Sequence, residues 1–324
     1  MKLDPSSGSP STPPELARPP QGLLERVFLS DDELRTIWRV LLYALFWITF
    51  SFGLDLLAIE LFGFPPTSIS VQRVLREDVL SFLAAFGAAL AMAKLERRDV
   101  DVYGLPRKRA FGKLFWQGCF LGLVEVSVLL GSIAALGGYS FGSVALHGQE
   151  IARWGGLWFV AFVAVGLSEE FLFRGYTQYT LARGIGFWPA AILLSVLFGA
   201  GHLWNPGESY VGAAGVTATG LVFAFTLRRT GNLWLAVGWH AAFDFGETFL
   251  YSVPDSGMLF EHHLSNASLH GATWLTGGTV GPEGSVFSFL TMGIMAMAVH
   301  FLFPGKGIVE ETKQEGVPPG ILHE

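Results

Sequence analysis

Two glutamates and an arginine lie inside an apolar stretch that is long enough to cross a membrane. A helix is predicted over residues 154–181, and its first part, residues 154–167, contains no charged side chain. Glu169, Glu170 and Arg174 follow in the same helix. A charged side chain at membrane depth costs about 3 kcal/mol or more, so ionisable residues there are rare and mark functional sites. This stretch therefore predicts a membrane helix that carries a functional site.

The composition indicates that most of the chain lies in lipid. Hydrophobic residues make up 51% of the 324 residues and charged residues 15%, whereas a soluble domain carries about 25% charged residues. Crossing an apolar layer of ~30 Å takes about 20 helical residues. We therefore predict an all-α fold, a polytopic transmembrane helix bundle of about eight spans, at residues 40–62, 79–95, 114–136, 154–181, 187–204, 210–227, 233–250 and 286–303.

The distribution of basic residues predicts the orientation. Lysines and arginines gather in the segment 94–113 and at Arg183, Arg228 and Arg229, whereas the long loop 251–285 has none. Basic loops stay on the cytoplasmic side, so both termini are predicted to be cytoplasmic in a multi-pass protein of a bacterial-type cytoplasmic membrane. The net charge of −6 gives no indication of a nucleic-acid partner, and membrane lipid is the expected surrounding.

The predicted spans divide the chain into four parts. We expect a disordered cytoplasmic arm at 1–33, N-terminal transmembrane helices at 34–150, a second transmembrane domain at 151–304 and a cytoplasmic tail at 305–324. The single cysteine of the chain excludes a disulfide framework and a thiolate-rich metal site.

Three clusters of polar side chains fall within the second transmembrane domain. Glu170 and Arg174 are four residues apart and share a helix face. An ion pair between two helices would explain one glutamate but not two, which leaves a carboxyl for general acid–base work. The other clusters are Phe198 to His202 and His240 to Asp244. Alone, a histidine within a span is most often a polar residue satisfied across a helix interface.

Other polar residues are expected to be structural. Asp55 and Glu247 lie near predicted span ends, where side chains reach the headgroups. Glu125 lies deeper and is predicted to pair with an inward-facing histidine or arginine. A solitary His300 and four residues of the loop 251–285 are interpreted as structural or solvated; these four are His262, His263, His270 and Glu283.

The clusters leave three functional classes open. A glutamate can activate water while histidines stabilise an oxyanion, or His202 and His240 with a carboxylate can hold a divalent metal such as zinc, with its bound water. The helical zinc motif H-E-x-x-H is absent. Buried acids and histidines also form proton relays in transporters. A non-catalytic membrane partner that keeps the same scaffold is the third class.

The order and spacing of the motifs resemble those of the CPBP family of CAAX proteases and bacteriocin-processing proteins. This family includes the Ras-converting CAAX protease and bacterial Abi-type membrane proteins. Its signature is Glu-Glu-x-x-x-Arg, Phe-x-x-x-His and His-x-x-x-Asn/Asp on separate spans, and here it stands at 169–174, 198–202 and 240–244. Segments 103–105 and 277–284 resemble further features of bacterial members.

The resemblance implies an intramembrane endopeptidase of the CAAX-processing type, with 151–304 as its catalytic domain. It implies that Glu169 or Glu170 activates the hydrolytic water, with Arg174 tuning their charge. His202 and His240 would bind water, the oxyanion or, if one is bound, a metal. Asp244, which replaces an asparagine of the CAAX protease, would support His240. The implied substrate is a peptide or protein, prenylated in the family's namesake reaction, and the choice between a glutamate and a metal mechanism stays open.

Overall fold

The structure is a computed structural model that describes residues 29–30, 33–66 and 68–305. Most of the predicted arm 1–33 and of the predicted tail 305–324 lies outside the described residues. The described chain is almost entirely helical, and its strands are two-residue pairs: β1 (Leu29–Ser30) with β2 (Glu33–Leu34), and β3 (Tyr139–Ser140) with β4 (Ser268–Leu269).

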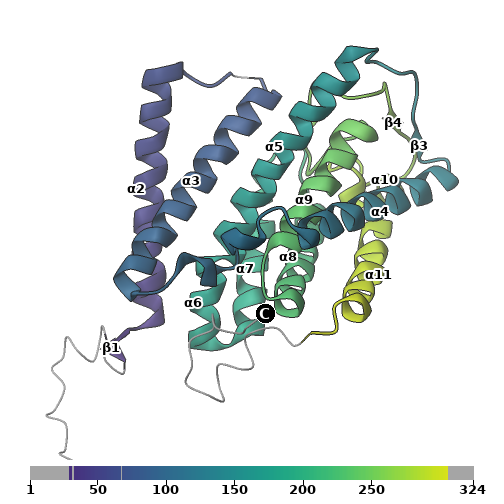
Figure 1. The fold of residues 1–324 in the computed structure, drawn as a ribbon. Coiled ribbons are helices and arrows are strands. Elements are labelled where there is room, and N and C mark those ends of the chain that lie inside the picture. Colours follow the sequence, from purple (N-terminus) through teal and green to yellow (C-terminus); the bar gives the residue numbers. More distant parts are fainter. Residues whose placement is uncertain (1–28, 31–32, 67, 306–324) are drawn as a thin grey trace, which may run out of the picture.

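The described chain is built mainly from α-helices, which are labelled in Figure 1. They are α2 (Thr36–Phe62), α3 (Val71–Glu96), α4 (Lys113–Ala135), α5 (Gln149–Arg174), α6 (Tyr176–Ile185), α7 (Phe187–His202), α8 (Tyr210–Thr230), α9 (Trp234–Phe245), α10 (Thr273–Thr276) and α11 (Val286–Leu302). A π-helical turn, η3 (Gly246–Leu250), continues α9, and short 3-10 turns include η4 (Pro282–Gly284).

The predicted all-α membrane bundle is confirmed. Five helical segments of the described chain are long and apolar enough to cross a membrane: α2, α3, α4, the run of α5 and α6, and α8. The helices α7 and α11 are apolar but shorter. The α9 helix reaches the expected end of its span, residue 250, only through the π-helical turn.

One predicted boundary is wrong, and one predicted span contains a break. The second span does not begin near residue 79 but at Val71, where the side chain of Ser70 caps the helix by accepting a hydrogen bond from the Arg73 amide. The charged residues of its first two turns had hidden this start. The fourth span is interrupted at Gly175, whose ψ of −120° is not helical, and α6 continues the run to Ile185.

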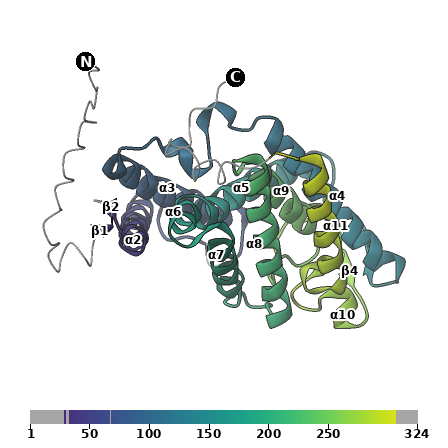
Figure 2. The same cartoon turned by 90° about the horizontal axis from the view of Figure 1, so that it is seen from below.

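Glycines let α4 and α9 approach each other closely. An added Cβ would lie 2.3 Å from the Trp239 carbonyl oxygen at Gly122, and 2.0 Å from the Phe115 carbonyl oxygen at Gly238. Small residues at such crossings allow direct backbone contact between membrane helices. In the view from below, α5 and α9 lie near the middle of the bundle, α2 lies toward one side, and α4 and α11 lie toward the other (Figure 2). This packing fixes α9, which carries His240.

The loops lie at two ends of the bundle. The segments around β3 and β4 pair with each other, and Figure 1 shows them at the same end as the α2–α3 connection. The basic segment 97–112 lies toward the other end, where the Gly104 carbonyl accepts a hydrogen bond from the Leu233 amide at the start of α9.

Candidate active site

A cavity of about 710 Å³ brings together residues from α3, α5, α7, α8, α9 and the loop 251–285. Four of the six predicted catalytic residues line it: Glu169, His202, His240 and Asp244. The other two, Glu170 and Arg174, are 0% and 1% exposed and lie behind this lining. The three motifs are far apart in the sequence, but each contributes residues to this one cavity. Glu170 and Arg174 of the first motif are buried next to it.

Glu170 joins α5 to α9. Its Oε1 accepts a hydrogen bond from Arg174 Nη1 at 3.1 Å and lies 3.0 Å from His240 Nδ1. An ionised carboxylate only accepts hydrogen bonds, so Nδ1 of the imidazole donates in this contact. The approach of the two helices depends on Gly166, where an added Cβ would lie 2.9 Å from the Val237 carbonyl oxygen.

Because Nδ1 is engaged by Glu170, the other ring nitrogen of His240 faces the remaining carboxylates. His240 Nε2 lies 3.6 Å from Glu169 Oε2 and 3.4 Å from Asp244 Oδ2. The side chain of Glu169 is 29% exposed, in contrast to that of Glu170. The two adjacent glutamates thus occupy different environments: Glu169 lines the cavity, and Glu170 is buried behind the cavity wall.

Arg174 is enclosed by an aromatic ring and by glycine. Its guanidinium carbon lies 4.3 Å from the ring centroid of Phe198, a cation–π geometry. On the other side, Gly220 of α8 leaves room for the guanidinium, since a Cβ there would lie 2.4 Å from Nη2. The phenylalanine of the second motif is therefore a packing partner of the arginine of the first.

His202 closes the cavity near the end of α7. Its Nδ1 lies 2.9 Å from the Phe198 carbonyl oxygen, one turn back on the same helix, and its ring packs edge-on to Phe198. This contact leaves Nε2 for the cavity. His202 and His240 therefore line the same cavity, although they come from different helices.

Sequence reasoning missed Asp78 and Asn205, which also line the cavity. Asp78 lies on α3 beside Ser168 and within electrostatic range of Glu169. It went unnoticed because it fell one residue before the predicted start of its span. Asn205 follows α7 and donates a side-chain hydrogen bond to the Ser256 carbonyl at 2.9 Å. In the sequence, Asn205 follows soon after His202 of the Phe-x-x-x-His motif, and this proximity was the one signal that could have indicated its place at the cavity.

The prediction for Glu125 is wrong. Its partner is neither a histidine nor an arginine but the indole of Trp239, whose Nε1 donates to Glu125 Oε2 at 2.7 Å. Glu125 is buried at the contact of α4 with α9 and lines the cavity. The indole N–H is a neutral donor, so it satisfies this carboxyl oxygen without adding a second charge.

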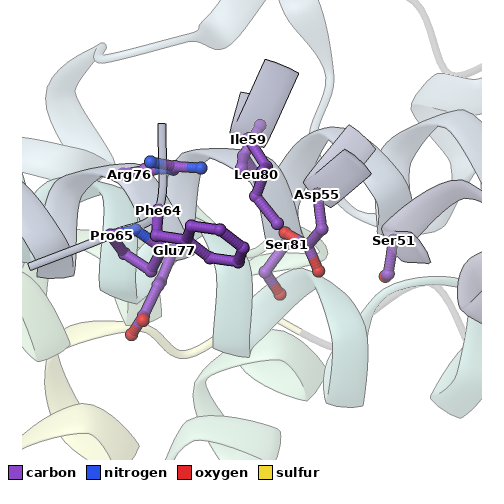
Figure 3. A pocket seen from close by; sticks show the side chains of 9 residues that line it. All are labelled: Ser51, Asp55, Ile59, Phe64, Pro65, Arg76, Glu77, Leu80 and Ser81. Atoms are coloured by element: carbon purple, nitrogen blue, oxygen red, sulfur yellow. The ribbon is translucent and has the colours of Figure 1, made fainter. Parts of the chain in front are cut away.

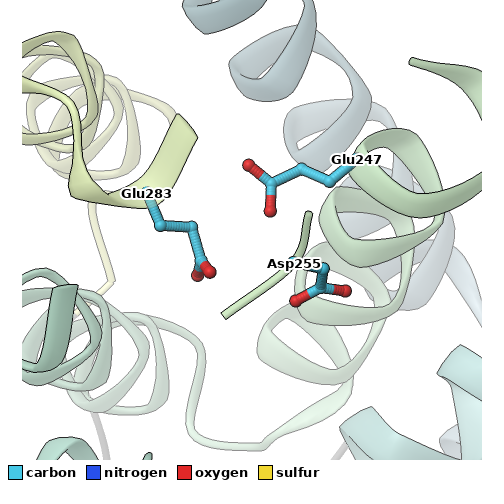
Figure 4. A group of neighbouring side chains, drawn as sticks. All are labelled: Glu247, Asp255 and Glu283. Carbon is cyan, nitrogen blue, oxygen red and sulfur yellow. The ribbon is translucent and has the colours of Figure 1, made fainter. Parts of the chain in front are cut away.

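Two expectations for isolated acids are also wrong. Glu247 does not reach the headgroups but is 0% exposed, and Glu283 is not solvated but lines the cavity. Together with Asp255 they place three carboxyl oxygens within 4.8 Å of one another (Figure 4). In the chain that the structure describes, this is the one group of three or more acidic, histidine or cysteine side chains that meets such a distance. Burial raises the pKa of Asp255 well above its usual value, and the nearby charge of Asp244 adds to this.

The histidines of the loop 251–285 make local contacts. The ring of His262 stacks on Trp154 at 3.7 Å between centroids, and His263 Nδ1 lies 2.7 Å from the Ser265 carbonyl oxygen. His270 Nε2 lies 2.9 Å from Ser268 Oγ. None of the three lines the large cavity.

A second cavity of about 510 Å³ lies between α2 and α3 (Figure 3). It contains Asp55 of α2 and, from α3, Arg76, Glu77 and Ser81. Glu77 lines both cavities, and the hydroxyl of Ser81 accepts a hydrogen bond from that of Ser168, which precedes Glu169. The smaller cavity therefore lies next to the larger one, and α3 contributes residues to both.

Comparison with known proteins identifies the segment that carries these motifs. Residues 151–246 match the family model described as type II CAAX prenyl endopeptidase, Rce1-like. This match shows that the segment is similar to that family. No curated protein and no solved structure matches the chain. The Rce1-like segment runs from α5 to the end of α9 and contains all six predicted catalytic residues. The long apolar helices and the family match support an integral membrane protein, and residues 151–246 are similar to a CAAX-type endopeptidase domain.

The two neighbouring glutamates should differ in their effect on stability. Glu170→Gln leaves Arg174 as a buried charge without its carboxylate, and breaking a buried pair in this way costs about 3 kcal/mol or more. Glu169→Gln changes a partly exposed side chain and should leave stability nearly unchanged. Thermal unfolding of both variants in detergent tests this, and equal melting temperatures would contradict the assignment.

Proposed function

We propose that the protein is an intramembrane endopeptidase of the CAAX-processing type in which Glu169 activates the hydrolytic water. The observation that carries the proposal is the contrast between the two glutamates. Glu170 is fully buried, and its Oε1 contacts the donors Arg174 Nη1 and His240 Nδ1. In contrast, Glu169 lines the cavity, and its Oε2 lies 3.6 Å from His240 Nε2. A general base must reach the proton it removes, and Glu169 is the glutamate that meets this requirement.

The other residues have distinct roles in this proposal. Glu170 is a positioning residue that holds the His240 ring, and Arg174 compensates its charge. With Nδ1–H donated to Glu170, Nε2 of His240 accepts a hydrogen bond when the ring is neutral and donates one when it is protonated. Asp244, one turn along α9, orients the ring through its 3.4 Å contact with Nε2.

The reaction follows from these positions. Glu169 takes a proton from water as the water oxygen attacks the peptide carbonyl carbon. The oxygen that gains negative charge accepts hydrogen bonds from protonated His240 or from His202, both of which line the cavity. Glu169 then passes its proton to the departing amine nitrogen as the carbon–nitrogen bond breaks. One water is consumed, and an acid and an amine are released.

The chemistry of the two histidines and their neighbours also suits a metal, although in the described chain these residues do not form a group whose ligand atoms all lie within 4.8 Å of one another. His202 and His240 each engage Nδ1 with the protein and leave Nε2 toward the cavity, and Glu169 and Asp244 offer carboxylate oxygens. These are the ligand types of a catalytic zinc site, where a bound metal would lower the pKa of a water and polarise the carbonyl. The chelator comparison below distinguishes the two mechanisms.

The substrate is proposed to be an apolar peptide. Phenylalanines make up much of the cavity wall, at positions 162, 173, 198, 223, 243 and 260. Such a surface binds apolar side chains or a prenyl group, while the acids and histidines act on the backbone. Competition by matched peptides with and without a prenyl group would show whether the lipid contributes to binding.

A second candidate, a proton-coupled transporter, is favoured by one observation. Buried polar side chains continue beyond Arg174, at Gln178 of α6 and Ser195 of α7, and their polar atoms have no hydrogen-bond partner within the protein. Buried polar atoms of this kind bind water, and a chain of waters conducts protons. Proton flux in liposomes without any peptide cleavage would favour this function over proteolysis.

Cleavage of a reporter peptide in liposomes tests the proposal. Glu169→Gln should lower kcat by about 10²–10⁴-fold, the usual contribution of a general base, while a matched substitution on the same helix, Glu150→Gln, should have no effect because Glu150 is exposed in the first turn of α5. A glutamate mechanism predicts that a chelator selective for zinc over calcium leaves the rate unchanged. Full activity of Glu169→Gln would contradict the role of this residue.

The cavity is also proposed to open toward the extracytoplasmic face. Its lining includes Arg73 at the start of α3, Asn205 after α7 and Ser256 in the loop 251–285. The basic segment 97–112 follows the other end of α3. In contrast, buried side chains such as Phe171, Tyr176 and Trp234 pack the core toward the basic end.

Cysteine labelling in whole cells tests this orientation. Cys119 is buried, so an exposed cysteine introduced elsewhere gives the main signal. Ala272→Cys in the loop 251–285 should react with a membrane-impermeant maleimide in intact cells, whereas Lys108→Cys should react only after permeabilisation; both positions are exposed. The opposite pattern would place the cavity on the cytoplasmic face.

A further inference from the structure

Three acidic side chains from separate segments meet beside the large cavity. Glu247 comes from the π-helical turn after α9, Asp255 from the loop that follows, and Glu283 from η4 before α11. One carboxyl oxygen from each lies within 4.8 Å of the others. Figure 4 shows the three carboxyl groups directed toward a common space. Like charges at this separation repel strongly unless something compensates them.

Glu247 provides a second observation that points to a ligand. It is 0% exposed, and neither of its carboxyl oxygens has a hydrogen-bond partner within the protein. Leaving a buried carboxyl oxygen unsatisfied is costly, and most buried polar atoms in proteins are therefore bonded. π-helical turns such as the one that carries Glu247 are frequent at functional sites.

The surrounding contacts orient the other two acids but supply no cation. Asp255 Oδ2 accepts a hydrogen bond from the Thr248 hydroxyl at 3.1 Å. Glu283 Oε2 accepts from the Ser256 amide at 2.6 Å and from its hydroxyl at 2.7 Å. Within the described residues, no arginine, lysine or histidine forms an ion pair with any of the three acids.

We propose that Glu247, Asp255 and Glu283 bind one hard divalent cation of the calcium type. Calcium is coordinated by oxygen atoms at about 2.4 Å, so two of its ligands lie no more than about 4.8 Å apart. The three acids satisfy this limit. The group contains no histidine or cysteine, which separates it from the nitrogen and sulfur ligands that zinc prefers. Bound water would complete the coordination shell.

The cation would hold the wall of the cavity in place. Asp255 and Glu283 line the cavity, and both act electrostatically on Asp244, the partner of His240. By joining the end of α9 to the loop 251–285 and to the start of α11, a cation at this position fixes the loop over the cavity. It also offsets three negative charges next to the proposed catalytic carboxylates.

Metal binding to the purified full-length protein tests the inference without reference to proteolysis. The protein in detergent is stripped with a chelator and equilibrated by dialysis against radioactive calcium. Wild type should bind one calcium and melt at a higher temperature in its presence. Glu247→Gln and Glu283→Gln should each weaken calcium binding by at least about tenfold, since each removes a charged ligand.

The matched control is Glu261→Gln, which removes an exposed carboxylate from the same loop and should leave binding unchanged. Glu283→Gln keeps the test valid if Glu247→Gln fails to fold, because Glu283 is only partly buried. Absence of stoichiometric calcium binding to folded wild type, or unchanged affinity in Glu283→Gln, would overturn the inference. In that case the three carboxyls hold protons instead. Proteolytic activity does not enter either outcome.

Discussion

The carboxylate of Glu170 accepts a hydrogen bond from Arg174 of its own helix and another from His240 of α9. Removing charged groups from water costs several kcal/mol each, and only mutual neutralisation with good geometry offsets that cost. Once α5 carries this carboxylate and arginine at membrane depth, α9 must bring a donor to the same place. The glycine contact at Gly166 allows the two helices to come close enough.

This buried contact separates two glutamates that are neighbours in the sequence. Because successive residues of a helix point about 100° apart, one of them faces the helix interface and the other faces the cavity. Glu170 is fully buried in this contact, whereas the side chain of Glu169 is 29% exposed and lines the cavity. The same contact fixes which nitrogen of His240 faces Glu169 and Asp244. In the proposed mechanism, positioning and chemistry are thus divided between adjacent residues.

The sequence was sufficient to predict the helical membrane fold and the main polar residues, because both depend on local patterns. Apolar length predicts spans, and the spacing of four residues places Glu170 with Arg174 and His240 with Asp244 on common faces. It could not distinguish the roles of Glu169 and Glu170, since these depend on how α9 packs on α5. The cavity also contains residues from separate segments, namely Asp78, Asp255 and Glu283. A local sequence pattern cannot predict contacts between residues so far apart in the chain. One helix start was missed where charge hid the apolar pattern, at Val71, and one break was missed at Gly175.

The protonation pattern of His240 is the most direct measure of the central contact. In protein labelled with nitrogen-15 at histidine, the His240 signals can be assigned by their loss in His240→Gln. The geometry predicts a proton on Nδ1, donated to Glu170 Oε1 at 3.0 Å, and a shift of both nitrogen signals in Glu170→Gln. A neutral ring with its proton on Nε2, or a spectrum that Glu170→Gln leaves unchanged, would contradict the arrangement on which the proposed chemistry rests.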